Sequence, residues 1–516
     1  MHASIPSFAV VGIDAVPITV EVDCVSAGSM DVSVWTVVGL GDAAIKESKE
    51  RVKAALKNSG MGLSQRRVTI NLAPADLRKE GSHYDLAIAL ALLASTERLE
   101  NGRARRFACI GELGLDGSVR AAPGALPMAL GARDARLDGI LVPRESAREA
   151  SYVADIAVYP VSTLVEAVAF LRGDRMIEPA KPEDPALAEA EAPEALLDFS
   201  DVRGQENAKR ALELSAAGGH NAILVGSPGS GKTMLARRLP TILPEMSFEE
   251  SIETTKIYSI AGQLSSRAGL MRQRPFRAPH HTASHVSLVG GGIIPRPGEV
   301  SLAHNGVLFL DEFPEFSRNT LEVLRQPLED RVVQISRAHM SLVFPASFIL
   351  VAAMNPCPCG YATHPEKRCL CNPQQVQRYL GRISGPLLDR IDLHVDVAPA
   401  RIDELHRKPP GEKSAPIRER ALEARARQAH RFKGRPGMHC NAQMNSRDLR
   451  TFCVMDDAAS GLLERAMKSL DLSARAYDRI LKVARTIADL EAAEHIAPAH
   501  ISEAVQYRTL DRSLWV

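Results

Sequence analysis

The chain has 516 residues, enough for about three domains, and its 63 basic and 62 acidic residues give a formal net charge of only +1. This balance gives no bulk-charge signal for nucleic-acid binding, and aromatic residues, at 4%, are too sparse for a large base-stacking surface. The sequence has neither an apolar run of about 18 residues nor the pattern of a signal peptide, so we expect a cytoplasmic protein with no membrane span.

Residues 1–175 are predicted to form an α+β domain. Alternating apolar and polar residues predict strands in its first part. Residues 42–58 have the pattern of a capped surface helix, and residues 84–95 that of a fully buried helix. The dipeptide Asp116-Gly117 between two short apolar stretches indicates a tight hairpin turn.

Two stretches of this domain, Lys79–Leu90 and Gly111–Arg120, resemble the Lon-protease-like domain. In a working Lon protease this fold carries a Ser–Lys dyad. Here the nucleophile position falls on His83 and the lysine position falls at or near Leu126. With neither a serine at the nucleophile position nor a lysine at the base position, the domain lacks the activated nucleophile of a Lon protease. The resemblance therefore disfavours a peptidase and implies a scaffold for oligomerisation or DNA contact.

Residues 176–197 are predicted to be a linker. They are acidic and rich in Pro and Ala, with no apolar pattern to bury, which favours an extended and solvated tether. The linker precedes an α/β domain that we predict for residues 198–398.

A phosphate-binding loop follows an apolar strand at Ala222–Val225. The sequence fits G-x-x-x-x-G-K-[ST] and opens a helix that we expect to end before Pro240. Glycines let backbone N–H groups surround phosphate oxygens, and the helix N-terminus adds positive partial charge. Lys232 is expected at the β- and γ-phosphates of ATP, and the Thr233 hydroxyl on Mg²⁺. The predicted ATP-binding residues are Gly226, Ser227, Pro228, Gly229, Ser230, Gly231, Lys232 and Thr233.

A second apolar strand, residues 306–310, ends in two acids, Asp311 and Glu312. The carboxyl ends of parallel strands face the nucleotide in α/β sheets. We therefore expect Asp311 to hold Mg²⁺ through water and Glu312 to polarise the attacking water.

Together these motifs resemble AAA+ ATPases, and the resemblance implies a role for Asn355. This residue follows a third apolar strand that begins at Phe348. It matches the sensor-1 position, where a polar side chain bonds the attacking water or the γ-phosphate. An Asn before Pro also forms turns, which is the alternative.

The same resemblance implies roles for two arginines. Arg390 matches the arginine finger that reaches the nucleotide of a neighbouring subunit; a salt bridge with Asp389 or Asp392 is the alternative. Arg475 matches the sensor-2 arginine of a helical lid, with Arg479 as the fallback.

Two insertions, residues 275–305 and 332–346, are predicted to be hairpins. In the magnesium-chelatase and minichromosome-maintenance branch of AAA+ proteins such hairpins point into a central pore, which implies contact with DNA. Histidines in the first insertion also allow a metal site, but its Gly-Gly-Gly run and prolines favour a hairpin. The candidate DNA-binding residues are Arg337 and His339 in the second insertion and Arg277, His280 and His281 in the first.

Four of the eight cysteines lie close together, in the pairs Cys357-Pro-Cys359 and Cys369-Leu-Cys371. Four thiolates on one loop bind Zn²⁺ tetrahedrally, although these pairs depart from the usual C-x₂₋₄-C spacing. Free or redox-active thiols are the alternative. The remaining cysteines are scattered, which is typical of a reduced cytosolic protein rather than of a disulfide framework.

Residues 399–516 are predicted to form an all-α lid. Residues 418–431 give this segment local positive charge, which favours a solvated helix face over a DNA groove.

The three domains together resemble the ComM/YifB magnesium-chelatase-like ATPases. The resemblance implies an N-terminal Lon-protease-like α+β domain, a central AAA+ P-loop α/β domain and a C-terminal all-α lid. It implies a hexameric ring that uses ATP to move on DNA and promotes branch migration during natural transformation. The alternatives are a chelatase-type motor acting on a protein partner, an ATP-dependent protease and a nucleotide-gated scaffold with little turnover.

Overall fold

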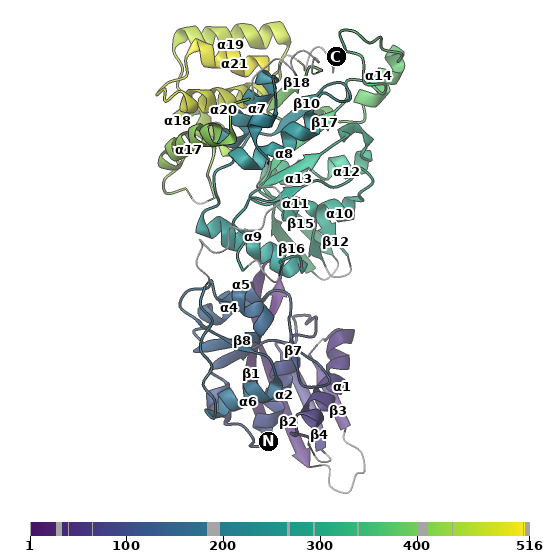
Figure 1. The fold of residues 1–516 in the computed structure, drawn as a ribbon, viewed down its shortest axis with the longest axis vertical. Helices are drawn as coiled ribbons and strands as arrows, with labels where there is room; N and C mark the ends of the chain where they lie inside the picture. The colour runs from purple at the N-terminus through teal and green to yellow at the C-terminus, as the bar shows by residue number, and fades with distance from the viewer. Residues whose placement is uncertain are drawn as a thin grey trace. The chain divides into compact units, whose positions relative to one another are not determined.

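The computed structural model describes most of the chain (Figure 1). It divides into two units, Met1–Glu191 with Ser251–Met271, and Ala192–Glu250 with Arg272–Val516. Much of the predicted linker, the start of the predicted lid and His339 lie outside the described residues. These are 2–26, 34–39, 41–63, 66–182, 197–265, 269–292, 295–337, 340–399, 411–435, 437–508 and 510.

The first unit is built around a sheet with strand order β1-β2-β4-β3. β1, β2 and β4 pair antiparallel, and β3 runs parallel to β4. Every second residue in the middle of β4 is buried, because one face of the sheet packs on the core. The strands are β1 (His2–Val11), β2 (Asp14–Ser26), β3 (Val34–Val38) and β4 (Arg66–Ala73).

Two helices of this unit confirm their sequence patterns. α1 (Ala43–Asn58) begins after Asp42, whose Oδ1 accepts a hydrogen bond of 2.9 Å from the backbone N–H of Ile45. α2 (Asp85–Ser95) is buried at every position and packs on β1 and β2. The all-apolar composition of α2 fits a helix enclosed on all sides.

The rest of the first unit includes a parallel three-stranded sheet, a hairpin, several short helices and most of α9 (Phe248–Ala261). The hairpin places Asp116 and Gly117 between β6 and β7, as the turn signal predicts. The elements are β5 (Phe107–Cys109), β8 (Gly139–Pro143), β9 (Ala157–Val161), β6 (Glu112–Leu113), β7 (Val119–Arg120), α3 (Asn101–Ala104), α4 (Ala125–Asp134), α5 (Ala147–Ala150) and α6 (Leu164–Arg172).

His83 is buried in this unit, and its Nε2 lies 2.9 Å from the carbonyl oxygen of Phe8. Burial lowers the pKa of His83 to about 4. A depressed folded-state pKa stabilises the fold above the unfolded value of about 6.5, and this stability is lost as the pH falls towards the folded value.

We expect the His83 contribution to unfolding free energy to fall by about 3 kcal/mol between about pH 7 and pH 4. His83→Gln should remove this part of the pH dependence, whereas His2→Gln, at an exposed position on β1, should retain it. Urea titrations monitored by Trp35 fluorescence in a Trp515→Phe background report on this unit, because the chain has two tryptophans. Identical pH dependences for the two variants would contradict the expectation.

The second unit contains a five-stranded parallel sheet in the order β11-β14-β17-β10-β18. Its three central strands, together with β18, are almost entirely buried, as continuous apolar runs predict. The strands are β10 (Ala222–Val225), β11 (Phe276–Arg277), β14 (Val307–Leu310), β17 (Ile349–Met354) and β18 (Leu393–Asp396).

Helices cover this sheet, and one of them corrects a prediction. α8 (Lys232–Ile242) continues through Pro240 instead of ending before it. Proline removes one backbone donor, which the last turn tolerates here because Leu239 and Ile242 are buried in the core. The other helices of this α/β region are α7 (Glu206–Gly218), α12 (Arg318–Glu322), α13 (Arg325–Asp330), α14 (Pro373–Leu380) and α15 (Gly385–Leu388).

The two predicted insertions form hairpins of different size. The second is the pair β15 (Val332–Arg337) and β16 (Met340–Pro345). The first is confined to β12 (Gly290–Gly291) and β13 (Arg296–Pro297), between α10 (His285–Val289) and α11 (Glu299–Leu302). At Gly290 the φ is +94°, and a Cβ would lie 2.3 Å from the Arg296 carbonyl oxygen, so this turn requires glycine.

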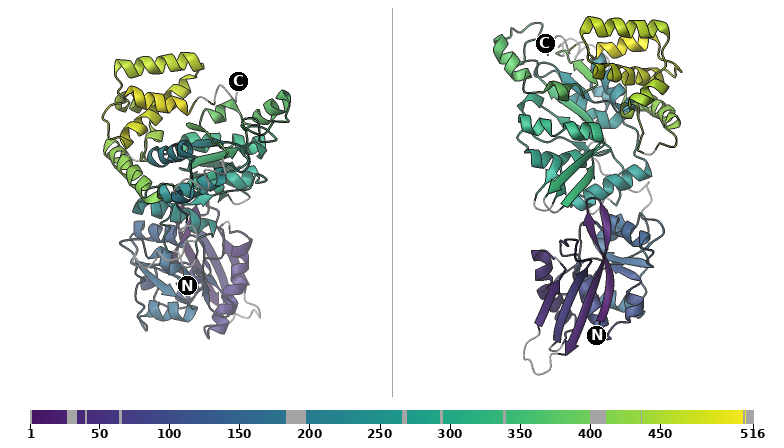
Figure 2. Two further views of the ribbon diagram at one scale, coloured as in Figure 1. Left: turned by 45° about the horizontal axis from the view of Figure 1, so that its top comes forward. Right: turned by 180° about the vertical axis from the view of Figure 1, so that it is seen from behind.

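The C-terminal helices share one core with the α/β sheet (Figure 2). α17 packs against α7 and α8, and α20 packs against α7. The last helix begins at Pro498, as predicted. The helices are α17 (Ser414–Arg431), α18 (Ser446–Phe452), α19 (Asp457–Leu470), α20 (Ala474–Leu490) and α21 (Pro498–Gln506). Within the described ranges, none of the helices has both the length and the apolar character needed to cross a membrane.

Candidate functional site

The loop between β10 and α8 has the backbone shape of a phosphate cradle. Gly229 and Gly231 have φ of +78° and +90°, and a Cβ on Gly226 would lie 2.3 Å from the Val397 carbonyl oxygen. This loop therefore admits only glycine at these positions without strain. The helix that follows begins at Lys232, so its free N–H groups face the loop.

Lys232 lies at the centre of the predicted site. Its Nζ donates to the carbonyl oxygens of Gly226 (2.7 Å) and Ser227 (2.9 Å) and to Oδ1 of Asn355 (3.2 Å). Burial lowers the pKa of this lysine, and nearby Asp311 opposes that shift. The prediction that Asn355 follows an apolar strand is confirmed by β17, and the pairing of β17 with β10 places Asn355 beside the P-loop.

Thr233 and Asp311, the predicted magnesium-binding residues, lie in direct contact. The Thr233 hydroxyl donates to Asp311 Oδ2 at 2.7 Å, although the two residues are 78 positions apart. Hydroxyl and carboxylate oxygens are the ligands that Mg²⁺ prefers in nucleotide sites. The two oxygens therefore fit a shared metal ion.

Glu312 is held in an unusual backbone conformation directly after β14. Its φ is +51°, in the left-handed region that non-glycine residues adopt at a cost of about 1–3 kcal/mol. Its side chain is 58% exposed, and its Oε2 lies 3.0 Å from Nδ1 of His281. The strained residue thus presents its carboxylate outside the strand, where a water molecule has access to it.

The sequence did not predict the contact between His281 and Glu312. The two residues are 31 positions apart, and only the pairing of β11 with β14 brings their segments together. A stretch of histidines after an apolar pair gave no signal for this contact.

His281→Ala should raise basal ATP turnover by about 1.4- to fivefold, because an exposed pair contributes about 0.2–1 kcal/mol and its loss frees the Glu312 carboxylate. Steady-state hydrolysis without DNA measures the effect. His280→Ala is the matched control, since Nδ1 of His280 is 2.9 Å from the Thr282 hydroxyl instead. Equal rates for wild type and His281→Ala would contradict the expectation.

Arg277, His280 and His281 do not lie on the first hairpin, which corrects the sequence-based placement. Arg277 belongs to β11 of the central sheet, and its guanidinium makes bonds of 2.7 and 2.8 Å to Glu299. A two-residue edge strand is too short to give a periodic signal. Arg337 ends β15, beside the turn of the second hairpin, as predicted.

Arg390 is buried and ion-paired within its own chain. It is 5% exposed, it donates to the Pro386 carbonyl oxygen, and its Nη2 pairs with Glu329. Its partner is therefore neither Asp389 nor Asp392. The arginine-finger role is untested by this geometry and stays a prediction.

Arg475 and Arg479 lie near the same end of the parallel strands as Arg390, which is the end where β10 begins. This end is called the arginine edge below. Arg475 is 61% exposed and 3.9 Å from Asp389, whereas Arg479 makes a 3.0 Å ion pair with Asp392. Asp392 directly precedes β18, whose first residue is level with the first residue of β10. The P-loop follows the other end of β10, so these arginines lie at the opposite edge from their own P-loop.

A cationic cavity of about 270 Å³ opens at this opposite edge. Its lining includes Arg331, Arg479 and Lys482 together with Glu329 and Asp392. Burial lowers the pKa of Lys482 to about 8, with Arg479 adding to the shift. The edge that carries the arginines is therefore rich in positive charge.

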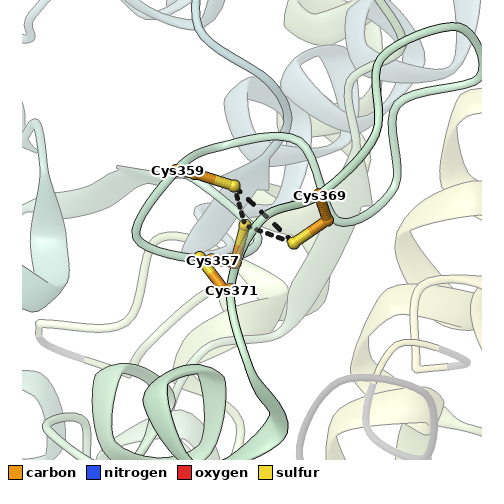
Figure 3. Close-up of side chains that lie close together, drawn as sticks. All are labelled: Cys357, Cys359, Cys369 and Cys371. Atoms are coloured by element: carbon orange, nitrogen blue, oxygen red, sulfur yellow. Dashed lines mark hydrogen bonds between the residues drawn. The ribbon is translucent and has the colours of Figure 1, made fainter.

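The four clustered cysteines converge on one point (Figure 3). The Sγ atom of Cys357 lies 3.4 Å from that of Cys359 and 3.7 Å from that of Cys369, and the latter two are 3.6 Å apart. With Cys371, all four sulfur atoms lie within 4.8 Å of one another. Backbone N–H groups of Leu370 and Tyr361 lower the pKa of Cys359 to about 6.

Comparisons with known proteins identify the family. Three family models match: "Magnesium chelatase, subunit ChlI" at residues 198–405, "Subunit ChlI of Mg-chelatase" at 20–146, and "Magnesium chelatase, subunit ChlI C-terminal" at 411–508. Competence protein ComM of Haemophilus influenzae is 44% identical over 513 residues, covering 99% of this chain and 98% of the relative.

Two further relatives are similar. The uncharacterized protein YifB of Escherichia coli is 45% identical over 507 residues, covering 98% of this chain and 97% of the relative. The magnesium-chelatase 67 kDa subunit of Chlorobaculum parvum is 28% identical over 167 residues, covering 31% of this chain and 24% of that protein. Because near-complete coverage accompanies the P-loop and its acidic partner strand, the chain belongs to the ComM/YifB family of magnesium-chelatase-like AAA+ ATPases.

Proposed function

We propose that this chain is an ATP-driven DNA translocase that works as a hexameric ring in the cytoplasm. The ring promotes branch migration while incoming single-stranded DNA is integrated during natural transformation. One observation carries the proposal: Lys232, Thr233 and Asp311 converge in a chain that is 44% identical to a competence protein over 513 residues.

Family membership implies ATP and Mg²⁺ as the nucleotide and its metal. When bound, Mg²⁺ neutralises charge on the β- and γ-phosphate oxygens. Thr233 and Asp311 would hold the ion, and Lys232 would exchange its carbonyl partners for phosphate oxygens. Zn²⁺ at the four clustered cysteines is a further proposed cofactor.

Glu312 and Asn355 are proposed to act on the attacking water. Glu312 has an exposed carboxylate beyond β14 and would accept the proton of that water. Asn355, already 3.2 Å from the Lys232 ammonium, would bond the water or the γ-phosphate.

The oligomeric part of the proposal rests on the distance between the arginines and the P-loop. β10 is four residues long, and a strand rises about 3.3 Å per residue, so the two edges of the sheet are about 13 Å apart. In this proposal Arg390 acts on the nucleotide of a neighbouring copy, and Arg475 keeps its role as the sensor-2 arginine of the lid. This arrangement requires an assembly in which every P-loop faces another protomer's arginine edge.

The proposed DNA contacts are in the second hairpin. On β15 and β16 one face is buried, through Val333, Ile335, Leu342 and Phe344, which fixes the hairpin on its own unit. Arg337, the last residue of β15, and His339, which lies outside the described residues, are the proposed contacts with the DNA backbone. His280 and His281 stay secondary candidates, and the Glu299 pair makes Arg277 the weakest candidate.

We also propose that residues 1–175 form a Lon-protease-like scaffold rather than a peptidase. The position of the Lon nucleophile holds His83, a buried side chain bonded to a backbone carbonyl. Residues 176–197 then act as the linker, 198–398 as the motor and 399–516 as the lid.

The runner-up function is a chelatase-type motor that remodels a protein partner. It is favoured by the family models, each of which describes a magnesium chelatase subunit. ATP turnover with and without forked or four-way DNA, followed by strand displacement, separates the two. Stimulation by branched DNA with strand displacement supports the translocase. Turnover that is indifferent to DNA and requires a protein partner supports the chelatase-type motor.

A further inference from the structure

We propose that Cys357, Cys359, Cys369 and Cys371 bind one Zn²⁺ ion, and that the metal-bound loop positions Asn355 and the P-loop for ATP hydrolysis. The inference deepens the proposed function, because it concerns control of the same nucleotide site. The loop is residues 357–371, called here the cysteine loop.

The sulfur positions match a tetrahedral metal site. With Zn–S bonds of about 2.3 Å, a tetrahedron places its sulfur atoms about 3.8 Å apart. The three Sγ–Sγ contacts among Cys357, Cys359 and Cys369 are 3.4, 3.6 and 3.7 Å long. All eight cysteines, each within the described residues, are free, so these pairs are not disulfides.

Backbone N–H groups donate to two of the four sulfurs, whereas burial raises the pKa of the Cys357 thiol. Gly360 and Ala362 donate backbone hydrogen bonds to Cys357, and Tyr361 and Leu370 donate to Cys359. N–H donors to sulfur favour the ionised form. Four thiolates this close repel one another strongly unless a cation lies between them, so the donor set fits a divalent metal of the zinc type.

The cysteine loop touches the nucleotide site from two directions. Cys357 comes two residues after Asn355, the partner of Lys232. On the other side Gly360, with φ of +86°, packs on the P-loop: a Cβ there would lie 2.4 Å from Pro228 Cδ and 3.8 Å from Asn355 Cγ.

The far end of the loop is tied to Asn355 as well. Cys371 is followed by Asn372, which caps α14 through a bond from the Gln375 N–H. Tyr379 of this helix receives a backbone hydrogen bond from Asn355. A metal that joins Cys357 to Cys371 therefore closes a ring of contacts around Asn355.

The test uses the full-length protein and two independent readouts. Metal analysis should give one zinc per chain, and replacement by Co²⁺ should give the absorption of a tetrahedral tetrathiolate site. Removal of the metal with a chelator should lower kcat at least about tenfold while the Kd for ATP changes little, because misplacement of about 1 Å strongly affects rate. Re-addition of Zn²⁺ should restore kcat.

Gly360→Ala separates positioning from metal binding. It keeps all four thiolates but forces the loop away from Pro228, so bound zinc should be retained while kcat falls. Gly434→Ala is the matched control, since Gly434 also has a positive φ but an added Cβ would meet no neighbour within 4 Å.

Each outcome of these measurements either supports or overturns the proposal. The proposal would be overturned if the purified protein held no metal, or if the cobalt-substituted protein lacked the tetrathiolate absorption. It would also be overturned if removal of the metal left kcat unchanged. A lowered kcat in both Gly360→Ala and the metal-free protein supports it. If the zinc-loaded wild type has no ATPase activity, the proposed function fails and so does the positioning role. The cobalt spectrum would then still establish whether a tetrathiolate site exists.

Discussion

Glu312→Gln should reduce ATP turnover by a factor of about 10²–10⁴ while ATP binding is retained. Glutamine keeps the size of the side chain but cannot accept the proton of the attacking water. The binding residues Lys232, Thr233 and Asp311 are untouched. Single-turnover hydrolysis and fluorescent-nucleotide binding measure the two quantities separately.

Glu315→Gln is the control for this experiment. Glu315 follows Glu312 by three residues and pairs with Arg382 at the surface. Loss of such an exposed pair costs about 0–1 kcal/mol, so turnover should stay near the wild-type rate. Wild-type turnover in Glu312→Gln would contradict the role of Glu312 in polarising the attacking water. Lost turnover without loss of biological function would leave a nucleotide-gated scaffold as the remaining function.

Arg390→Ala should lower turnover by about 10³–10⁵-fold, because an arginine supplied to the γ-phosphoryl group neutralises charge that develops in the transition state. Since Arg390 lies at the opposite edge from its own P-loop, the defect should be rescued between subunits. Inactive Arg390→Ala protein mixed with inactive Glu312→Gln protein should hydrolyse ATP. In a random equal mixture about a quarter of the sites combine an intact Glu312 with an intact Arg390.

Glu329→Gln distinguishes a catalytic from a structural Arg390. If Arg390 serves only its pair with Glu329, then removing either partner should produce a similar loss. If Arg390 serves a neighbour's nucleotide, Glu329→Gln should keep most of the activity and the mixture should be active. An inactive mixture together with an impaired Glu329→Gln would overturn the shared site.

Local sequence patterns were sufficient for the elements that position the nucleotide. The P-loop, the strand before Asp311 and the strand before Asn355 are each encoded within about ten consecutive residues, so apolar runs and glycines predict them. The buried helix α2 and the Asp116-Gly117 turn are predictable for the same reason. The parallel order of β14, β17 and β10 brings their ends together.

The remaining features depend on contacts between distant segments. The His281–Glu312 and Arg390–Glu329 pairs join residues that no local pattern links. The two-residue strand β11 is too short for a periodic signal, which led to the wrong placement of Arg277. The predicted helix ended before Pro240 because a proline usually stops a helix. In the structure, burial of the last turn lets α8 continue to Ile242.

The separation of the P-loop and Arg390 along β10 restricts the symmetry of assembly. If each protomer takes Arg390 from one neighbour and lends its own Arg390 to another, the contact joins two different surfaces. Such a contact would be heterologous and would repeat until the rotation closes; an open string would leave one P-loop at its end without an arginine. Specific activity should therefore fall steeply on dilution, at the concentration where closed assemblies dissociate.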